Sequence, residues 1–586
     1  PDMAIRELIQ NAHDAILRRR ERDLSYRGLI DIVQNAAERR LQIHDDGVGL
    51  SSSEAEEYLC TLGVGMTRLI KQGLQGHTPA SGLIGQFGVG LFSAFMLADT
   101  VIVESRRFDG DVGIRWEAGA GPITLLSEID RGEAGTTVTL CLKADHGALA
   151  ENEELLDAAV KQYADFLPVP IHLNHGKSRS NVINVAWFEP TPEQGSVELE
   201  LEGYFSETPL DVIPIRVENP TAIAGALYVT PQRTPGFAGD PVVTVTVRRM
   251  VVSRNIQGLL PPWASFVRGV LELSECAPTT SREDLVRNPK FEQIRRVLEQ
   301  KLFEHFERLA TEDPVRWESL LAWHRYTWAG AALNERRLRD LLRRTYRLPT
   351  SQGPLTFDDI LGRSLADPLF ENEAERVVWY NSDRRQEGWI NTLFTGHDLP
   401  CVHALRSFEE ALLAAWAADT SAEGTLTDVR TASPGSPNFA EQVLGIRDLE
   451  DAPPEWQEFL SATGAQVLCA SFRSQQPVMA FLNERYELLT TFEELKKRSS
   501  IPAGFQRLID AHFEDSPTGR NEVLLNRNHR LVRRALEQKT TSPLASVLRL
   551  LVHNALTAAG AALPRAILDQ QTEDLDWIAE ALWGRS

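Results

Sequence analysis

Four polar residues at helical spacing could perform chemistry near the start of the chain. The segment RELIQNAHDAILRRR (6–20) contains Glu7, Asn11, Asp14 and Arg18. Successive helical residues turn by roughly 100°, so these four fall within a stripe of roughly 60° beside an apolar face. Such a stripe is usually solvated surface. The functional alternative makes Glu7 a general base and Asn11 a metal-binding amide, both facing a cleft, and the segment alone leaves both interpretations open.

A second candidate lies at the end of an alternating strand pattern, in LQIHDDGVGL (41–50). The strand ends in Asp45 and Asp46, and Gly47 and Gly49 then allow the backbone to turn. A strand-end turn explains most isolated matches of this kind. The alternative places the Asp45 carboxylate on the floor of a pocket, where it accepts a hydrogen bond from a base amino group. A charge-assisted bond of this type contributes roughly 1.5 to 3 kcal/mol.

The third candidate is the glycine-rich run GLIGQFGVGLFSAF (82–95). It has neither the GxxxxGK[ST] pattern of a P-loop nor a dinucleotide-binding GxGxxG at the end of a buried strand. Glycine-rich backbone leading into a helix N-terminus offers free amides and a positive dipole end, which favour an anion. A buried, glycine-packed helix is the alternative that this run leaves open.

These motifs must be positioned by a mixture of helices and strands. Helical patterns are predicted at 3–20, 53–60, 88–98 and 151–166, and strands at 29–36, 40–46, 100–105, 136–142, 183–188, 212–218, 225–230 and 242–252. This mixture predicts an α/β multidomain protein with an N-terminal α/β sandwich. Helical stretches follow to about 345 and a smaller α/β segment to about 425, while TASPGSPN (431–438) reads as a linker. Two apolar-faced helices are predicted at 542–563 and 572–583, the second opened by acidic residues.

Composition excludes several classes of protein. The chain has 586 residues and a net charge of −21, which disfavours a general nucleic-acid binder. No apolar run is long enough for a membrane span, and five scattered cysteines without a CxxC pattern fit a reducing cytoplasm. The chain starts at Pro1 without an initiator methionine, so we expect the natural chain to begin further upstream.

The three motifs, in this order and with GTTVTL (135–140), resemble the GHKL ATPase superfamily. The segment 247–285, with its RGV strand and SRE turn, resembles the middle domain of the ninety-kilodalton heat-shock protein family, bacterial type. The resemblance continues through 332–344, 377–385, 523–536 and the C-terminal helices. It implies an N-terminal ATP-binding domain (1–178), a middle domain (179–435) and a mainly helical C-terminal dimerisation domain (436–586).

The resemblance also implies roles for individual residues. Glu7 would polarise the attacking water, and Arg282 would arrive from the second domain to stabilise the γ-phosphate charge; the alternative for Arg282 is helix-start electrostatics beside the N-cap residue Ser281. Asn11 would coordinate Mg²⁺, and Asp45 would bind the adenine amino group. The remaining nucleotide-binding positions would be Asp14, Arg18, Gly49, Leu50, Gly85, Gln86, Phe87, Gly88, Val89, Gly90 and Thr136.

The resemblance implies an ATP-dependent, cytoplasmic molecular chaperone that uses ATP and Mg²⁺. It would act as a homodimeric clamp on partly folded client proteins, pairing through its C-terminal helices and binding neither nucleic acid nor membrane. Three positions depart from the family pattern: Tyr58 replaces an asparagine, Val64 a lysine and Val286 a polar residue. These departures support the alternative of a nucleotide-responsive scaffold with little ATP turnover. A DNA-linked ATPase is disfavoured by the acidity.

Overall fold

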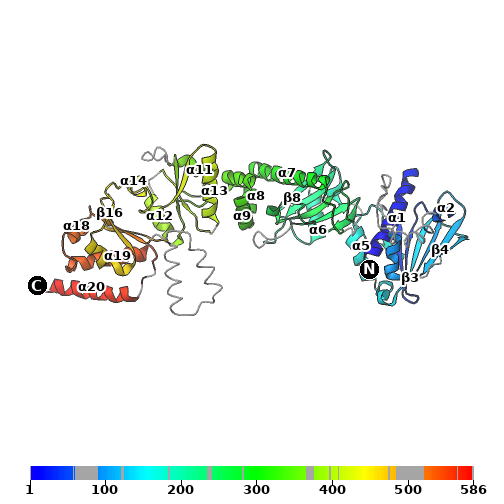
Figure 1. The fold of residues 1–586 in the computed structure, drawn as a ribbon, viewed down its shortest axis with the longest axis horizontal. Coiled ribbons are helices and arrows are strands. Elements are labelled where there is room, and N and C mark those ends of the chain that lie inside the picture. Colours follow the sequence, from blue (N-terminus) through cyan, green and yellow to red (C-terminus); the bar gives the residue numbers. More distant parts are fainter. Residues whose placement is uncertain are drawn as a thin grey trace, which may run out of the picture. The chain divides into compact units, whose positions relative to one another are not determined.

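The computed structural model describes residues 2–56, 59, 90–119, 124–182, 185–193, 195–233, 241–279, 283–364, 375–394, 398–406, 408–472, 476–483, 520–561, 563 and 565–583. The chain divides into two compact units, Pro1–Arg308 and Leu309–Ser586 (Figure 1).

A seven-stranded sheet with the strand order β5-β4-β3-β6-β2-β1-β7 organises the first part of unit 1. Neighbouring strands are antiparallel except for β1 and β7, which are parallel. The strands are β1 Ile30–Asn35, β2 Arg40–Asp45, β3 Ala98–Arg106, β4 Gly113–Gly119, β5 Thr124–Ile129, β6 Gly135–Leu142 and β7 Ile171–Leu173. The predicted strands at 29–36, 40–46, 100–105 and 136–142 are therefore confirmed.

Helices pack on this sheet and complete its core. Ile5, Ile9 and Ile16 of the first helix are fully buried, and buried and half-buried residues alternate along β2, as a half-covered strand requires. The helices are α1 Asp2–Arg22, α2 Ser52–Ala55, η2 Gly90–Ser93, α4 Ala94–Leu97, η3 Ala144–Ala150 and α5 Glu153–Ala164. The predicted helices at 3–20 and 151–166 are confirmed, and the core lies between α1, α5 and the sheet.

The helix predicted at 88–98 is shorter than expected. Its described part is a 3₁₀ turn, η2, followed by a single α-helical turn, α4, and Ala98 already pairs with Leu142 as the first residue of β3. The residues that follow are mostly β-branched, which favours the strand over continued helix. Of the helix predicted at 53–60, the structure describes α2, which a capping box between Ser51 and Glu54 opens.

A five-stranded sheet with the order β11-β10-β12-β9-β8 organises the rest of unit 1. Its strands are β8 Asp211–Val217, β9 Ile223–Val229, β10 Val242–Val247, β11 Met250–Ser253 and β12 Val267–Glu272. The accompanying helices are η4 Ala186–Phe188, α6 Ser196–Phe205, η5 Pro262–Ala264 and α7 Pro289–Glu312. The run at 242–252, which reads as one strand, is divided by a turn at Arg248 and Arg249, both with positive φ.

The strand predicted at 183–188 is wrong over its last three residues, which form the 3₁₀ turn η4. Trp187 and Phe188 are both buried, although a strand would point consecutive side chains to opposite faces. Both rings pack edge-to-face against Phe166, with centroids 5.9 and 5.8 Å away. The turn therefore allows the Trp187 and Phe188 rings to pack in the same aromatic cluster around Phe166.

Unit 2 contains two further sheets. The first has the all-parallel order β14-β13-β15 and the second has the order β16-β17-β19-β18. The strands are β13 Arg376–Asn381, β14 Cys401–His403, β15 Thr427–Thr431, β16 Glu450–Asp451, β17 Gln466–Ala470, β18 Val478–Phe481 and β19 Glu522–Asn526. The helical stretches to about 345 and the α/β segment to about 425 are confirmed.

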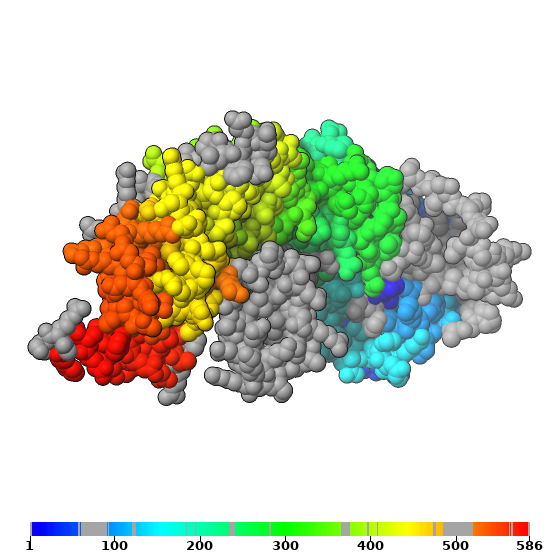
Figure 2. Space-filling view, turned by 60° about the vertical axis from the view of Figure 1, so that its left-hand side comes forward, coloured from blue at the N-terminus to red at the C-terminus, as the bar shows by residue number. Residues whose placement is uncertain are grey.

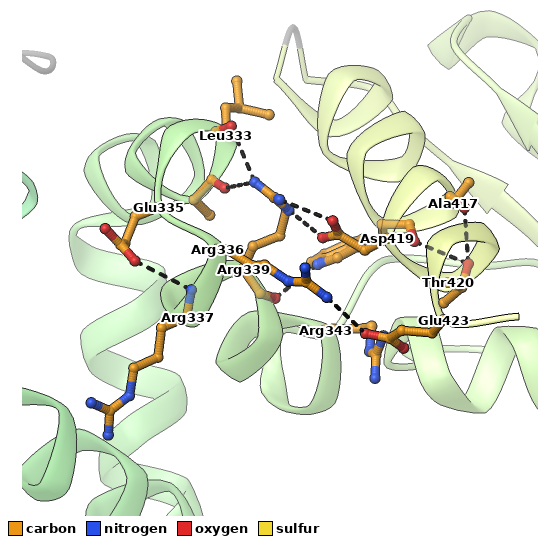
Figure 3. Close-up of polar contacts among 12 residues, drawn as sticks. Leu333, Glu335, Arg336, Arg337, Arg339, Arg343, Ala417, Asp419, Thr420 and Glu423 are labelled. Atoms are coloured by element: carbon orange, nitrogen blue, oxygen red, sulfur yellow. Dashed lines mark hydrogen bonds and ion pairs between the residues drawn. The ribbon is translucent and has the colours of Figure 1, made fainter.

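Helices surround both sheets of unit 2. They are α8 Pro314–Trp323, α9 Arg325–Asn334, α10 Arg336–Thr345, α11 Phe357–Arg363, η6 Arg384–Gln386, α12 Glu387–Phe394, α13 Glu409–Ala422, α14 Phe439–Gln442, α15 Pro454–Phe459, η7 Ser461–Thr463, α18 Arg530–Leu536, α19 Pro543–Ala558 and α20 Arg565–Trp583. Arg339 of α10 and Asp419 of α13 face each other (Figure 3), with Nη2 of Arg339 3.0 Å from Oδ1 of Asp419. This two-point ion pair fastens α10 to α13.

The expected linker at 431–438 is packed within unit 2. The hydroxyl of Ser433 donates a hydrogen bond to the Glu522 carboxylate, and the backbone N–H of Gly435 donates another at 3.0 Å. A Cβ at position 435 would collide with the same carboxylate. The segment therefore packs against β19 and is not an unpacked linker. The predicted domain limits stay predictions.

The two predicted C-terminal helices are present as α19 and α20. The second begins at Arg565, seven residues before the predicted start at 572, so its acidic residues lie inside the helix rather than at its first turn. Across the described ranges, no helix is both long and apolar enough to cross a membrane.

Candidate functional site

Asp45 occupies the last position of β2 and is 5% exposed. Its neighbour across the sheet is Thr136 of β6, and the Gly47 backbone N–H donates a hydrogen bond to its Oδ1 at 2.9 Å. Burial raises the pKa of Asp45 to about 7, because desolvation outweighs the N–H groups of Gly47 and Thr136 that favour the charged form. A hydrogen-bonding carboxyl with a pKa this high suits a ligand-binding position.

The turn after Asp45 is held between α1 and β3. Gly49 has a φ of +66°, and a Cβ there would collide with the backbone oxygen of Arg106, so this position requires glycine. The backbone N–H of Val48 donates to the Ala15 carbonyl of α1 at 3.0 Å. The backbone of this turn therefore lies directly against the helix that carries the polar stripe.

Ser105 of β3 joins three parts of the site and was not among the predicted site residues. It is fully buried, and its Oγ accepts the Leu50 N–H at 2.9 Å. The same hydroxyl lies 3.1 Å from the Gly135 carbonyl oxygen and 2.9 Å from Oγ1 of Thr136. Ser105 shares the inward alternation of Val101 and Val103, and a polar residue at an inward position is the signal that could have found it.

Asp46 has a different environment from Asp45. Its Oδ1 accepts the Leu29 N–H at 2.7 Å, and its backbone oxygen accepts hydrogen bonds from Arg19 at 2.6 Å and Tyr26 at 2.5 Å. The Arg19 guanidinium lies 4.0 Å from the centroid of the Tyr26 ring. Arg19 and Tyr26 thus hold the turn through its backbone. Neither was among the predicted site residues.

The polar stripe of α1 is unevenly buried. Glu7 and Asp14 are 7% and 8% exposed, whereas Asn11 and Arg18 are exposed. Burial of two acidic residues contradicts the interpretation of the stripe as ordinary solvated surface. Glu7 and Asn11 lie one helical turn apart, so a buried carboxylate stands beside a solvent-accessible amide.

The glycine-rich segment is described only from Gly90 onward. Gly90 opens η2, which packs against α1, and Leu91 and Phe95 contact the core. The predicted residues Gly85, Gln86, Phe87, Gly88, Val89 and Arg282, with the departures Tyr58 and Val64, lie outside the described residues. Val286 is 41% exposed, and its N–H donates to the Ala277 carbonyl at 2.9 Å.

The described side chains suit a magnesium ion that takes few of its oxygen ligands from the protein and most of them from a bound substrate and water. Within the described ranges, no group of three or more His, Cys, Asp or Glu residues could hold a metal by itself. Mg²⁺ commonly takes one or two protein oxygens and completes its shell with water and substrate phosphates. An exposed amide such as that of Asn11 meets this modest requirement.

Comparison with known families agrees with the motifs. Residues 1–118 match the family described as histidine kinase-, DNA gyrase B-, and HSP90-like ATPase, and residues 205–352 match the family described as Hsp90 protein. The first match contains the α1 stripe, Asp45 and the glycine-rich run. The second contains the segment 247–285.

Curated relatives named chaperone protein HtpG are similar to much of the chain. The protein of Chlorobium phaeovibrioides is 29% identical over 342 residues, 54% of each chain. That of Oleidesulfovibrio alaskensis is 27% identical over 412 residues, 66% of this chain and 63% of the relative. That of Methylorubrum populi is 33% identical over 322 residues, 51% of each chain. The chain thus spans about half to two thirds of the length of these relatives.

Proposed function

We propose that this chain is an ATP-dependent, cytoplasmic chaperone of the Hsp90 family, within the GHKL ATPase superfamily, that works as a homodimeric clamp. The observation that supports this most directly is the buried Asp45 carboxyl, held by Gly47 at the turn that packs on α1. A buried acceptor at the floor of the site suits the amino group of adenine.

In this proposal the residues around Asp45 form the adenine site. Asp45 accepts the adenine amino group, while Gly49 and Thr136 contribute backbone and water-mediated contacts. Leu50 contributes from the same turn, and Ser105 positions both Leu50 and Thr136 through its hydroxyl. The ionised form of Asp45 is the better acceptor, because a protonated carboxyl oxygen would face the amino donor with a donor of its own.

Hydrolysis would be performed from α1 and the second domain. Glu7 accepts a proton from the attacking water, and Asn11 is a ligand of the magnesium ion that neutralises phosphate charge. Asp14 and Arg18 complete the α1 contacts. We place the phosphates along 85–90 and assign Arg282 the stabilisation of charge on the γ-phosphate, a type of contact that accelerates such reactions by about 10³ to 10⁵.

Nucleotide would act on clients through a shift between open and closed states. ATP changes such an equilibrium only through contacts that differ between the two states. Arg282, which lies in a different domain from Asp45 in our proposal, supplies such a contact. Client proteins are then held or released according to the bound nucleotide.

The exposed apolar line on α20 supports pairing of two copies. Leu568, Leu575 and Leu582 are 53%, 58% and 68% exposed and follow each other at heptad spacing. Trp577 and Trp583 add to this surface, and α20 is visible in red at the surface of unit 2 in Figure 2. A self-complementary contact between two such helices gives a twofold dimer.

Two measurements on the full chain test the function. We expect steady-state ATP hydrolysis and suppression of aggregation of a chemically unfolded model protein, with Arg282→Ala abolishing the first while leaving ATP binding in place. ATP binding without turnover in the wild-type chain would instead favour the scaffold alternative. Absence of both ATP binding and aggregation suppression would refute the chaperone assignment.

A further inference from the structure

The four-stranded sheet of unit 2 has an open edge that borders an apolar cleft. β18 is the last strand in the order β16-β17-β19-β18, and within the described ranges its one partner strand is β19. A cleft of about 270 Å³ runs beside β18, between α12 and α19, which are both labelled in Figure 1. We call it the edge cleft; β18 and the residues just before it line one side.

The pairing register shows which backbone groups face the edge cleft. The Asn526 N–H donates to the Pro477 carbonyl at 2.9 Å, and Met479 lies opposite Leu524. Hydrogen-bonded positions alternate along an antiparallel strand, so the backbone groups of Pro477, Met479 and Phe481 point toward β19. Those of Val478, Ala480 and Leu482 therefore point away from it.

A side chain already pairs with the last of these outward positions. Nε2 of Gln386 donates to the Leu482 carbonyl at 2.8 Å, and the Leu482 N–H donates to Oε1 of Gln386 at 3.0 Å. One amide thus reproduces the contacts of a neighbouring strand. The outward groups of Val478 and Ala480 make no hydrogen bond to any residue that the structure describes.

These two unpaired positions are nearly buried. Val478 and Ala480 are 7% and 3% exposed, and both line the edge cleft. Buried backbone groups without partners are unfavourable, and open strand edges pair readily with added chains. The spacing of two residues between them matches the repeat of an extended strand.

The described lining of the edge cleft is mostly apolar and has no charged side chain; its polar members are Gln476 and Asn554. Trp389 of α12 forms one wall, and Leu551, Ala555 and Ala558 of α19 form the other. The small alanine side chains leave the space beside the strand. The Trp389 indole N–H is buried without a partner among the described residues.

We propose that the edge cleft binds an extended, uncharged segment of a client polypeptide, which adds to the sheet as a strand beside β18. The segment would pair with the backbone of Val478 and Ala480 and place apolar side chains against Trp389 and α19. The described residues of the lining include no ionisable side chain, which disfavours charged segments, because these would lose hydration without gaining a partner there. The identity of the ligand as a client rests on the function proposed above.

A pair of peptides tests the backbone pairing on the full-length chain. The probe is a fluorescein-labelled peptide of about eight alternating valine and threonine residues, and its control has every backbone nitrogen methylated. We expect the first peptide to bind and the second to bind at least about tenfold more weakly, since methylation removes the donors. Amide hydrogen exchange at Val478 and Ala480 should slow by about tenfold when the first peptide is bound.

Matched substitutions on α19 test the location. Ala558→Arg places a long cation at the exposed rim of the edge cleft and should weaken peptide binding at least about tenfold. Thr557→Arg makes the same change at the adjacent exposed residue, outside the lining, and should leave affinity within about twofold. Equal affinity of the Ala558→Arg and wild-type chains, or equal binding of the two peptides, would overturn the inference.

The proposed peptide binding in the edge cleft and the proposed chaperone function can be refuted independently. Asp45→Asn should lower ATP affinity by roughly 10- to 100-fold and keep peptide affinity. A chain that hydrolyses ATP and suppresses aggregation but does not bind the peptide would contradict the edge cleft alone. Peptide binding that meets the criteria above, in a chain without ATP turnover or aggregation suppression, would contradict the chaperone proposal alone.

Discussion

The backbone N–H of Gly47 donates a hydrogen bond of 2.9 Å to Oδ1 of Asp45, so the carboxyl and the glycine two residues later form a closed turn. The neighbouring Asp46 directs its carboxylate to the Leu29 N–H instead. Two adjacent acidic residues thus have separate tasks: Asp45 lies buried at the proposed site, and Asp46 anchors the turn. This difference provides a matched pair of variants.

Asp45→Asn should lower ATP affinity by roughly 10- to 100-fold, which corresponds to loss of one charge-assisted hydrogen bond. The asparagine oxygen can still accept the Gly47 N–H, so the turn should persist, but the amide nitrogen meets the adenine amino group donor to donor. Titration calorimetry measures the affinity. Asp46→Asn is the control and should bind ATP within about twofold of wild type. Unchanged affinity in Asp45→Asn would show that Asp45 does not bind adenine.

The raised pKa of Asp45 predicts a pH dependence of stability. The folded pKa is about 7, and that of an unfolded aspartate is about 3.9, so the folded state binds more protons between these values. The contribution of Asp45 to the free energy of unfolding therefore falls as pH rises from about 4 to about 7 and is constant above. The asparagine side chain of the Asp45→Asn variant cannot titrate. Thermal unfolding should therefore show this variant gaining stability relative to wild type across this interval, and parallel curves would contradict the burial of an ionisable Asp45.

Glu7→Ala should retain ATP binding within about threefold and lose at least about 100-fold in turnover, because it removes the proposed base and leaves the adenine contacts. Steady-state hydrolysis and a binding titration measure the two quantities separately. Glu21→Ala changes an exposed glutamate of the same helix and should hydrolyse ATP normally. Wild-type turnover in the Glu7 variant would remove Glu7 from the mechanism.

Ser105→Ala should destabilise the ATPase domain by about 1 to 3 kcal/mol and weaken ATP binding. The substitution leaves the Leu50 N–H and the Thr136 hydroxyl without the Ser105 oxygen. Differential scanning fluorimetry with and without ATP reports both effects. Ser127→Ala, on the exposed face of β5, is the control with an expected change below about 0.5 kcal/mol. Equal effects of the two substitutions would mean that Ser105 does not hold the site together.

Leu575→Asp should convert the proposed dimer to a monomer, since it places a charge at the centre of the apolar line on α20. Sedimentation velocity measures the state of assembly. Leu199→Asp introduces the same charge at a 71% exposed leucine of α6 and should leave assembly unchanged. A wild-type chain that is monomeric at micromolar concentration would exclude the α20 interface at the outset.

The sequence by itself determined the features that depend on local residue patterns: the positions of helices and strands and the order of the motifs. Alternation along 40–46 located the strand that ends in Asp45, helical spacing located α1, and the order of the motifs indicated a resemblance that the family matches over residues 1–118 and 205–352 support. The structure differs from the predicted helix 88–98 and the predicted strand 183–188 in part of each segment. Residues distant in the chain determine the secondary structure there. Leu142 pairs with Ala98 as a strand, and Phe166 gathers Trp187 and Phe188 onto one cluster.

Only the tertiary structure decided which polar residues are buried and by what. Asp45 and Asp46 are alike in sequence, but the carboxyl of one is buried beside Thr136 and that of the other faces Leu29. Ser105 became part of the site through Leu50 and Thr136, which lie 55 and 31 residues away along the chain. Burial and hydrogen bonding depend on segments that meet only after folding, and no local pattern contains that information. The edge position of β18 also could not be predicted from its own residues, because it depends on which strands pair with it, and among the described strands only β19 does.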